Sequence, residues 1–599
     1  MRSQLADLFY KNAAEMPDKQ AIWCDGKTAT YQEMANRVSR YSNYLVAKGV
    51  QYGDHVAIPM NNSIESVALF FSAADLGVCL VPLNPTLPLE SIKVAMKSGD
   101  MKHLIARKSF LNECEKKGGV DVPGITVCLD GEFEGAFPFS EVATMPTTRP
   151  ACENIKGDES LILTMTSGST GTPKPIDISQ QNKIDRSLTH IRVYGLVKED
   201  RILAATPLYH SLAERLVIMP LLLGATSILL PRFTPALWLK CAAEQKPTFT
   251  IAVSAQLAQI LELLKQENTE SIDSFHTIVS SSALLEEKVK LELIDRLQCE
   301  FHEMYGTSET STATDICFQK ARNKQKSVGL PFDEAEVKIL RDDEDTECAV
   351  GEVGEIAVKS KLTCKGYYKL KNMMDMATTE GFFRTGDLGY MDEDGYLYFA
   401  GRKKELIITG AINVYPNDVD AVVNQLTAVE ECAAFSYPDE RLGEVVALAV
   451  VVKEDCELTE RTIKTYCAKN LADFQQPHKI FFVDMLPKNT MGKLQRNRIL
   501  DPIRNVGIDK YKEITTMTDI KEFVTEYIQR EYTVPEDVDI MTLNYIEAGY
   551  IDSMAFIQFI STIEDEYDIE FEVEDIENPK LRIVGKLIDF IQAKIDEQH

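Results

Sequence analysis

Short apolar runs alternate with longer amphipathic stretches through the first 400 residues of the chain. The run at 55–59, for example, is followed by a helix-length pattern over 64–76. Short apolar runs bounded by turn residues are typical of buried strands. Similar runs lie at 78–82, 161–165, 227–231, 249–253 and 277–279. The alternation predicts an α/β region whose strands are covered by helices.

The pattern changes after residue 402. Residues 403–506 combine alternating segments at 447–452 and 480–483 with helical stretches, which predicts a small α+β subdomain. Residues 507–518 are polar and lack periodicity, so we expect a linker there. The chain is therefore predicted to be an α/β multidomain protein with a large N-terminal domain over 1–402, this subdomain, the linker and a last domain over 519–599.

The last domain is predicted to be an all-α bundle. Apolar residues fall on one helical face in three stretches, and three such helices in about 80 residues suit a small bundle. The residues on these faces are Ile520, Phe523, Val524, Tyr527 and Ile528, then Phe556, Ile560, Ile563 and Tyr567, then Ile583, Val584, Leu587, Ile588 and Ile591. Residues 519–599 hold 21 acidic and 6 basic side chains, and the whole chain has a net charge of −28. The negative electrostatic field of this domain favours basic partner surfaces and excludes nucleic acid as a partner.

Composition narrows the class of protein further. The chain has 599 residues, 45% of them hydrophobic, which suits about four globular units. Its N-terminus has no apolar core segment, and its longest apolar runs are too short to span a membrane. The 13 cysteines form no CxxC pair and only 8 histidines occur, so neither a zinc site nor a disulfide framework is indicated. We expect a cytoplasmic protein without a membrane span.

A phosphate-binding loop is predicted at residues 166–174, which have the sequence TSGSTGTPK and follow the strand-like LILTM. Glycines and small residues let a backbone turn direct its N–H groups at phosphate oxygens, while hydroxyls and a lysine add donors and charge. Pro173 precedes the lysine, so the loop is not a Walker A motif. A flexible surface turn is the alternative. The expected phosphate-binding residues are Thr166, Ser167, Gly168, Ser169, Thr170, Gly171 and Lys174.

This loop resembles the signature of the adenylate-forming superfamily, which includes acyl-CoA synthetases, peptide-synthetase adenylation domains and luciferases. The resemblance covers nearly all of residues 1–500. Residues 305–310, YGTSET, are similar to the family's Tyr-Gly-x-Thr/Ser-Glu pattern. The resemblance implies that Tyr305 stacks on adenine, Ser308 contacts the α-phosphate of ATP and Glu309 holds Mg²⁺, a hard cation that prefers oxygen ligands. Without the resemblance, Glu309 would be interpreted as a solvated helix start.

Further family segments follow in order. They are 384–387 (RTGD), 401–405 (GRKKE), 410–416 (GAINVYP, with Ala411 where the family usually has glycine) and 487–493 (PKNTMGK) followed by Arg496. The resemblance implies that Asp387 binds the ribose hydroxyls, Arg402 reaches the ribose and Lys404 occupies the hinge. Lys493 would be the catalytic lysine, placed between the carboxylate and the α-phosphate. Two half-reactions are implied: formation of an acyl-AMP from a carboxylate and ATP, then attack of a thiolate on the activated carbonyl.

The acid substrate is harder to predict. Peptide-synthetase domains for α-amino acids usually carry an aspartate in a Phe-Asp pattern, whereas residues 207–211 are PLYHS here. This resembles the branch that activates fatty or aryl acids. Glu214 could accept an amine, although a solvated or Arg215-paired carboxylate is the alternative. The predicted pocket residues are His210, Val253, Ser254, Ser281, Ala283 and Gly306.

Ser553 is the candidate attachment point of a phosphopantetheine arm. Residues 549–554, GYIDSM, are similar to the Gly-x-x-Asp-Ser-Leu motif of acyl and peptidyl carrier proteins, with Met554 in place of leucine. The alternative is an ordinary helix N-cap. The resemblance implies 4′-phosphopantetheine, a phosphopantetheinyl transferase that attaches it, and a downstream assembly-line enzyme that docks on the acidic carrier domain.

Three functions follow from these segments. The first is an ATP-dependent ligase that loads its own carrier domain in a biosynthetic assembly line. The second is an acyl-CoA synthetase that uses free CoA, with the carrier-like tail as a docking module. The third is a non-enzymatic carrier or scaffold protein, against which the complete set Lys174, Glu309, Asp387, Arg402 and Lys493 argues.

Overall fold

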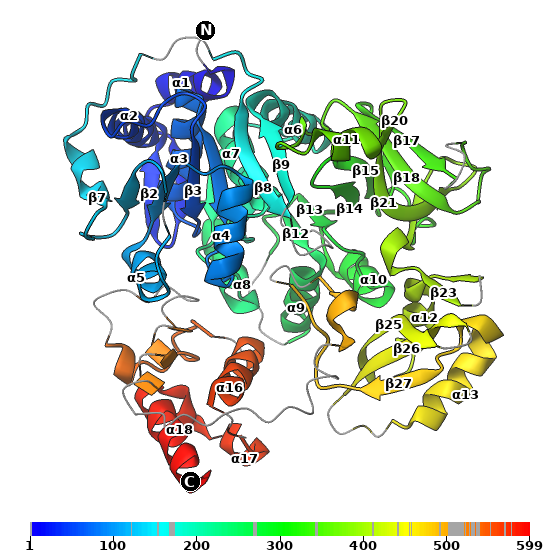
Figure 1. Cartoon of the computed structure of the whole chain (residues 1–599). Helices are drawn as coiled ribbons and strands as arrows, with labels where there is room; N and C mark the ends of the chain where they lie inside the picture. The colour runs from blue at the N-terminus through cyan, green and yellow to red at the C-terminus, as the bar shows by residue number, and fades with distance from the viewer. Residues whose placement is uncertain are drawn as a thin grey trace.

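The structure is a computed structural model, drawn in Figure 1 from blue at the N-terminus to red at the C-terminus. It describes residues 3–120, 122–151, 155–166, 174–266, 272–341, 346–409, 412–439, 442–453, 456, 458–489, 493–500, 520–521, 523–525, 527–528, 534, 539–551, 553–567, 569, 571–576 and 578–598. The predicted linker at 507–518 lies outside these residues.

A nine-stranded sheet has the order β16-β15-β14-β13-β12-β10-β11-β1-β2. Its five central strands, β14 to β11 in that order, are parallel, so their carboxyl ends share one edge. β12 is buried along its whole length, as an apolar run predicts. The strands are β1 (Gln20–Cys24), β2 (Lys27–Thr30), β10 (Arg201–Ala204), β11 (Thr226–Leu229), β12 (Phe249–Val253), β13 (Thr277–Ser281), β14 (Glu300–Thr307), β15 (Ser311–Cys317) and β16 (Leu330–Pro331).

An eight-stranded sheet has the order β19-β9-β8-β4-β3-β5-β6-β7. Its central strands β8, β4, β3, β5 and β6 are parallel, and β8 pairs with β9 in an antiparallel hairpin. The strands are β3 (His55–Pro59), β4 (Cys79–Leu83), β5 (His103–Ala106), β6 (Thr126–Cys128), β7 (Phe137–Pro138), β8 (Ser160–Thr166), β9 (Lys174–Ser179) and β19 (Gly366–Tyr367).

Helices pack around and between these two sheets (Figure 1). Almost every side chain of α3 and α7 is buried, because both helices are mostly apolar and belong to a core cluster that includes strands of both sheets. The helices of this part are α1 (Gln4–Glu15), α2 (Tyr31–Ala47), α3 (Ile64–Leu76), α4 (Leu89–Ser98), α5 (Lys108–Lys116), α6 (Gln180–Val193), α7 (Ser211–Leu223), α8 (Pro235–Gln245), α9 (Ser254–Leu264), α10 (Glu287–Arg296) and the 3₁₀ helix η1 (Phe139–Thr144).

Two smaller sheets follow. The first contains β17 (Ala335–Leu340), β18 (Gly354–Ser360), β20 (Thr378–Thr379), β21 (Phe382–Met391) and β22 (Leu397–Arg402), with α11 (Lys371–Met376) nearby in sequence. The second contains β23 (Ile407–Thr409), β24 (Ile412–Val414), β25 (Val429–Asp439), β26 (Gly443–Val452) and β27 (Lys479–Phe482). α12 (Pro416–Val423) and α13 (Glu460–Asn470) pack on this second sheet, which gives the expected small α+β unit (Figure 1).

The C-terminal part is helical. It contains η5 (Ile540–Thr542), α16 (Ser553–Tyr567), α17 (Val573–Ile576), η6 (Pro579–Arg582) and α18 (Val584–Gln598), and the described residues among 520–528 are also helical. Their apolar faces share one core, in which Ile520, Val524, Phe559, Ile563 and Leu587 are buried. The predicted fold class, an α/β large domain with a small α+β unit and a C-terminal helical bundle, is confirmed. Among the described residues, no helix is both long and apolar enough to cross a membrane.

Candidate functional site

The predicted phosphate loop connects the two strands of a hairpin. Thr166 at the end of β8 pairs with Lys174 at the start of β9, so the two ends of the loop are held side by side. Ser167, Gly168, Ser169, Thr170 and Gly171 lie outside the described residues. The structure therefore describes the entry and exit of this loop, and Lys174 at its exit.

Glu309 lies close to this exit, in the turn between β14 and β15. The Tyr367 hydroxyl donates to Glu309 Oε1 at 2.8 Å, and Lys174 Nζ is 5.9 Å from the centroid of the Tyr367 ring. The Arg186 guanidinium donates to the backbone oxygen of Glu309 at 3.0 Å and, at 3.4 Å, to that of Ser308. Burial, followed by the charge of Glu309, raises the pKa of Tyr367. Tyr367 thus orients the carboxylate that the sequence assigns to Mg²⁺.

Asp387 is held between two other predicted site residues. The Tyr305 hydroxyl donates to Asp387 Oδ2 at 2.9 Å, and Arg402 Nε lies 3.3 Å from Asp387 Oδ1. β21 and β22 produce this second contact, because their register sets Asp387 opposite Arg402. Burial raises the pKa of Asp387, and the charge of Arg402 opposes this rise. The hydroxyl of Tyr305 therefore has a role of its own, in addition to the ring stacking that the sequence predicts.

Lys493 enters the same cavity from the small subdomain. The cavity has a volume of about 1040 Å³, and its lining includes Tyr305, Asp387, Arg402 and Lys493. Asn489 closes the loop that carries the lysine: its side chain accepts from Lys493 N, and its backbone N–H donates to Lys493 O, both at 2.9 Å. Burial and the charge of Arg402 lower the pKa of Lys493, while Asp387 opposes this.

Four predicted site cations act on one another beside Asp387. The pKa of Lys404, the predicted hinge residue, is lowered by burial and by the charges of Arg402 and Lys174. Burial and the charges of Arg402 and Lys404 in turn lower the pKa of Lys493, so the structure brings Lys174, Arg402, Lys404 and Lys493 close together. Prearranged cations of this kind stabilise the charge that develops on a transferring phosphoryl group. Arg496 also lines the cavity, and it holds the subdomain together through Asp420, at 2.5 Å, and Asn417, at 2.8 Å.

The predicted acid-pocket residues come from one edge of the nine-stranded sheet. His210 follows β10, Val253 ends β12, Ser254 begins α9, Ser281 ends β13, and Gly306 lies near the end of β14. Ala283 and Gly306 also line the cavity of Lys493, whereas His210, Val253, Ser254 and Ser281 are not part of its lining. Burial lowers the pKa of His210 to about 4, so its imidazole is neutral at pH 7. A neutral ring suits the wall of an apolar pocket.

Ser553 is the first residue of α16. The structure describes nothing of its side chain, and Asp552 lies outside the described residues. The corner before the helix contacts the large domain. Arg232 donates through Nη2 to the backbone oxygen of Gly549 at 2.7 Å, and its guanidinium carbon lies 4.5 Å from the centroid of the Tyr550 ring.

Comparison with known families gives three matches in chain order. The AMP-binding enzyme profile matches residues 9–368. The chain belongs to the AMP-binding enzyme family. The AMP-binding enzyme C-terminal domain matches residues 418–493, and the phosphopantetheine attachment site matches residues 522–588. ATP and phosphopantetheine are thereby established as its cofactors.

Individual relatives of this AMP-binding enzyme are ligases. The chain is 29% identical to the long-chain-fatty-acid–CoA ligase FadD13 of Mycobacterium tuberculosis over 468 residues, which is 78% of this chain and 91% of that one. It is 28% identical to the 2-succinylbenzoate–CoA ligase of Bacillus licheniformis over 494 residues, 82% of this chain and 98% of that one. The ATP-bound structure of MatB from Rhodopseudomonas palustris is 27% identical, with a TM-score of 0.76, over 84% of this chain and 100% of that one. This AMP-binding enzyme is an ATP-dependent, AMP-forming acid–thiol ligase with a carrier domain.

One expectation about this enzyme is wrong. Glu214 is fully buried, neither solvated nor paired with Arg215, and its Oε2 atom forms an ion pair with Lys183, which is 3% exposed. Arg215 instead donates to Ser311 at 3.0 Å and to Thr312 at 3.1 Å. The Glu214 side chain is sealed from solvent and its Oε2 is held by Lys183, while Oε1 is buried without a hydrogen-bond partner. The sequence offers no local sign of this pair, because its members lie 31 residues apart on two helices.

Two further residues that contact the candidate site or the carrier domain were missed from the sequence. Tyr367, which orients Glu309, lies in the short strand β19, and no motif quoted for the family contains it. Arg232, which contacts the carrier corner, follows β11 in a segment without a recognised motif. The only local signal for Arg232 is its position just beyond the carboxyl end of a buried parallel strand, where ligand contacts are common.

Proposed function

We propose that this enzyme activates a fatty or aryl carboxylic acid, rather than an α-amino acid, and loads it onto phosphopantetheine attached to its own Ser553. The observation that carries the proposal is the contact of Arg232 with Gly549 and Tyr550, which joins the carrier corner to the large domain. The burial of Glu214 supports the choice of acid, because this carboxylate is sealed from solvent and its Oε2 is paired with Lys183 in the described structure. Relatives named as fatty-acid, 2-succinylbenzoate and indoleacetate ligases support the same choice.

The first half-reaction joins a carboxylate oxygen of the acid to the α-phosphorus of ATP and releases pyrophosphate. In our proposal Lys174, Lys493 and the phosphate loop offset the negative charge that gathers there, and Ser308 contacts the α-phosphate. Asp387 and Arg402 hold the ribose, and Tyr305 packs on the adenine. Glu309, oriented by Tyr367, supplies the carboxylate oxygen that Mg²⁺ prefers.

The second half-reaction forms a thioester. The phosphopantetheine thiolate attacks the carbonyl carbon of the acyl-AMP, and the bond to AMP breaks. Lys493 lies in the nucleotide cavity here, so the described arrangement suits the first half-reaction. We propose that the small subdomain then rotates about Lys404, which withdraws Lys493 and admits the thiol.

The carrier corner lies at the edge of the sheet where the acid is expected to bind. β10 and β11 are parallel neighbours, so His210 after β10 and Arg232 after β11 extend from the same edge. Ser553 lies three positions after Tyr550, and three extended residue steps span at most about 11 Å. Docking at Arg232 therefore keeps the attachment serine near the edge of the acid pocket. Tethering raises the effective concentration of the thiol to about the millimolar range, which favours loading within one chain.

Intact-protein mass spectrometry tests the proposal directly. The protein is treated with a phosphopantetheinyl transferase and CoA, then with ATP, Mg²⁺ and a panel of fatty, aryl and amino acids. A phosphopantetheine adduct followed by an acyl increment is expected from a fatty or aryl acid. Ser553→Ala is the control, which must remain unmodified while it still exchanges pyrophosphate into ATP. An increment from α-amino acids alone, or none on a protein that carries the arm, would overturn the proposal.

Arg232→Ala tests the docking contact. Loss of the cation–π contact and of one charged hydrogen bond is expected to slow single-turnover loading about 5- to 100-fold. ATP–pyrophosphate exchange should not change, because Arg232 is outside the nucleotide cavity. Arg322→Ala is the matched control, since Arg322 is exposed and lies on the same domain. Equal loading by both variants would contradict docking through Arg232.

A second candidate function is ligation of the acid to free CoA, with the carrier domain as a docking module. The relatives named as CoA ligases favour it. The ratio of the two rates decides between the candidates. If acyl transfer to CoA exceeds transfer to the carrier at equal thiol concentration, the CoA ligase is the better description. In the self-loading proposal, an assembly-line enzyme in the cytoplasm then takes the acyl group from the acidic carrier domain.

A further inference from the structure

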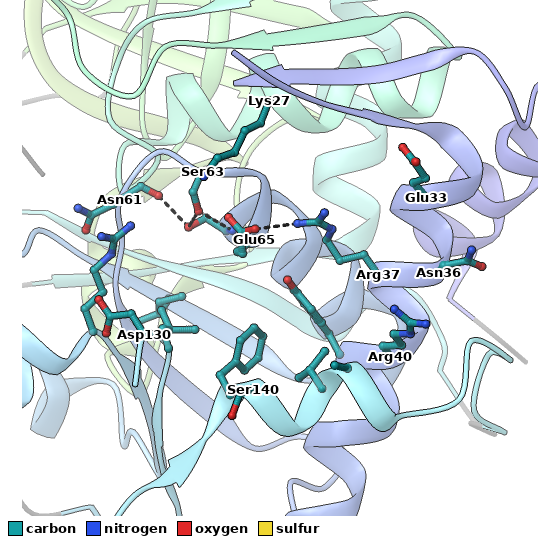
Figure 2. A pocket seen from close by; sticks show the side chains of 18 of the residues that line it. Lys27, Glu33, Asn36, Arg37, Arg40, Asn61, Ser63, Glu65, Asp130 and Ser140 are labelled. Carbon is teal, nitrogen blue, oxygen red and sulfur yellow. Dashed lines mark hydrogen bonds and ion pairs between the residues drawn. The ribbon is translucent and has the colours of Figure 1, made fainter. Parts of the chain in front are cut away.

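A second cavity lies in the N-terminal half of the large domain and shares no lining residue with the nucleotide cavity. Its volume is about 710 Å³. It opens where three neighbouring parallel strands end: Pro59 is the last residue of β3, Arg107 directly follows β5, and Leu129 directly follows β6. Figure 2 shows Arg37, Arg40, Asn61, Glu65 and Asp130 around this space.

The topology at this place is typical of ligand sites. The chain runs from β3 to β4 on one side of β3, and then to β5 on the other side, so the strand order reverses between β3 and β5. In open α/β sheets, ligands bind outside the carboxyl ends of the strands at such a reversal. Helix α3 also begins here, with Ser63 as its N-cap, and Ser63 and Ser66 line the cavity. The positive end of a helix dipole attracts anions.

The acidic side chains of the cavity already have partners. Glu65 pairs with Arg37 at 2.7 Å, as the dashed line in Figure 2 shows. Glu33 accepts from the backbone N–H of Thr30 at 2.8 Å, and Asp130 accepts from that of Lys108 at 2.6 Å. Each carboxylate is therefore oriented by a protein donor.

Three cations of the cavity differ from these acids. Within the described part of the chain, the side chains of Lys27, Arg40 and Arg107 make no hydrogen bond or ion pair with another protein group. The Nε atom of Arg40 is buried and has no acceptor. A buried donor without an acceptor is costly, so such groups usually mark an interaction with something outside the protein chain. The lining as a whole holds four basic side chains, Lys27, Arg37, Arg40 and Arg107, and three acidic ones, Glu33, Glu65 and Asp130.

The cavity also has an aromatic wall. Tyr41 and Phe139 meet edge to face, with ring centroids 4.7 Å apart, and both line the space. We propose that this cavity binds a phosphate-bearing small molecule, with Arg40 and Arg107 as its guanidinium contacts. The planar guanidinium matches two phosphate oxygens at once, and an aromatic wall accommodates an organic group attached to the phosphate. The proposal does not depend on carrier loading.

Two probes test the site on the full-length protein, with the nucleotide cavity saturated by AMP. Isothermal titration with inorganic phosphate measures whether the bare anion is sufficient, and adenosine 3′,5′-bisphosphate measures whether an attached organic group adds affinity. One site is expected for at least one probe. Arg40→Gln and Arg107→Gln should each weaken it roughly tenfold or more, as loss of a charged hydrogen bond predicts.

Matched variants separate binding from folding. Arg322→Gln removes an exposed arginine outside the cavity and should bind both probes like the unsubstituted protein. Arg40→Lys keeps the charge but loses the planar fork, so an intermediate affinity is expected. All variants should keep ATP–pyrophosphate exchange within about twofold of the unsubstituted protein, since the cavity shares no lining residue with the nucleotide site. No binding of either probe, or equal affinity in all variants, would overturn the proposal.

Discussion

The buried pair of Lys183 and Glu214 allows the sharpest test of how the large domain is built. Lys183 is 3% exposed and Glu214 is fully buried, and the second carboxylate oxygen, Oε1, has no hydrogen-bond partner. Burial lowers the pKa of Lys183 to about 8, although the charge of Glu214 opposes this. Lys183→Met would leave a buried carboxylate without its cation. Breaking a buried pair in this way costs about 3–5 kcal/mol of folding free energy.

The double variant Lys183→Met/Glu214→Leu removes both charges and replaces them with apolar groups of similar size. Its free energy of unfolding is expected to lie within about 2 kcal/mol of that of the unsubstituted protein, because replacing both members of a buried pair is often close to neutral. Lys198→Met is the control. Its partner Glu15 lies 3.6 Å away and both side chains are about half exposed, so the expected loss is about 0–1 kcal/mol.

Urea unfolding followed by tryptophan fluorescence is the appropriate assay. The chain has 2 tryptophans, Trp23 and Trp238, and both lie in the large domain, so the signal reports on that domain alone. A shift of the midpoint at constant slope measures the change in stability. The interpretation is refuted if Lys183→Met lowers the free energy of unfolding by less than about 1 kcal/mol, or if the double variant lowers it by at least as much as Lys183→Met does. In either case Lys183 and Glu214 are not a buried, coupled pair.

The pair also makes a prediction about substrates. The double variant should keep the unsubstituted protein's preference in ATP–pyrophosphate exchange between a carboxylic acid and the matching α-amino acid. If exchange with an amino acid depended on Glu214, that carboxylate would be open to substrate and the structural interpretation would be refuted.

Three further predictions concern the nucleotide site. Lys493→Ala should slow acyl-AMP formation about 10²- to 10³-fold in pyrophosphate exchange, while transfer from supplied acyl-AMP is kept; equal loss of both steps would contradict the assignment. Because burial and Arg402 lower the pKa of Lys493, its charge should be lost as pH rises through that lowered pKa, below the ordinary 10.5. The rate of acyl-AMP formation should therefore decline in this alkaline range, whereas the rate of acyl transfer should not. A rate of acyl-AMP formation that stays unchanged up to pH 10.5 would argue against a charged Lys493. Asp387→Asn removes the charge that faces Arg402, so the KM for ATP should rise about 10- to 100-fold, and an unchanged KM would exclude Asp387 from nucleotide binding.

Local patterns were sufficient where a segment's own side chains decide its conformation. The apolar runs at 55–59 and 249–253 coincide with β3 and β12, because a strand buried on both faces is mostly apolar. The run at 227–231 was displaced from β11, which spans Thr226–Leu229, because strand ends depend on pairing with a neighbour. The family segments were likewise identified without the structure, since each is a short contiguous sequence.

The tertiary structure alone decided which distant side chains meet. Tyr367 reaches Glu309 across 58 residues, and the Tyr305 hydroxyl reaches Asp387 across 82 residues. Periodicity describes the face on which a residue lies but not the partner on the opposing element, so neither contact was predicted. Glu214 illustrates the same limit: its sequence position suggested a carboxylate open to substrate or solvent, and the packing of α6 against α7 instead buried it beside Lys183. The sequence determined the strands and the chemical groups, whereas packing decided which of those groups are open to a ligand, because burial and pairing depend on all the elements that surround a residue.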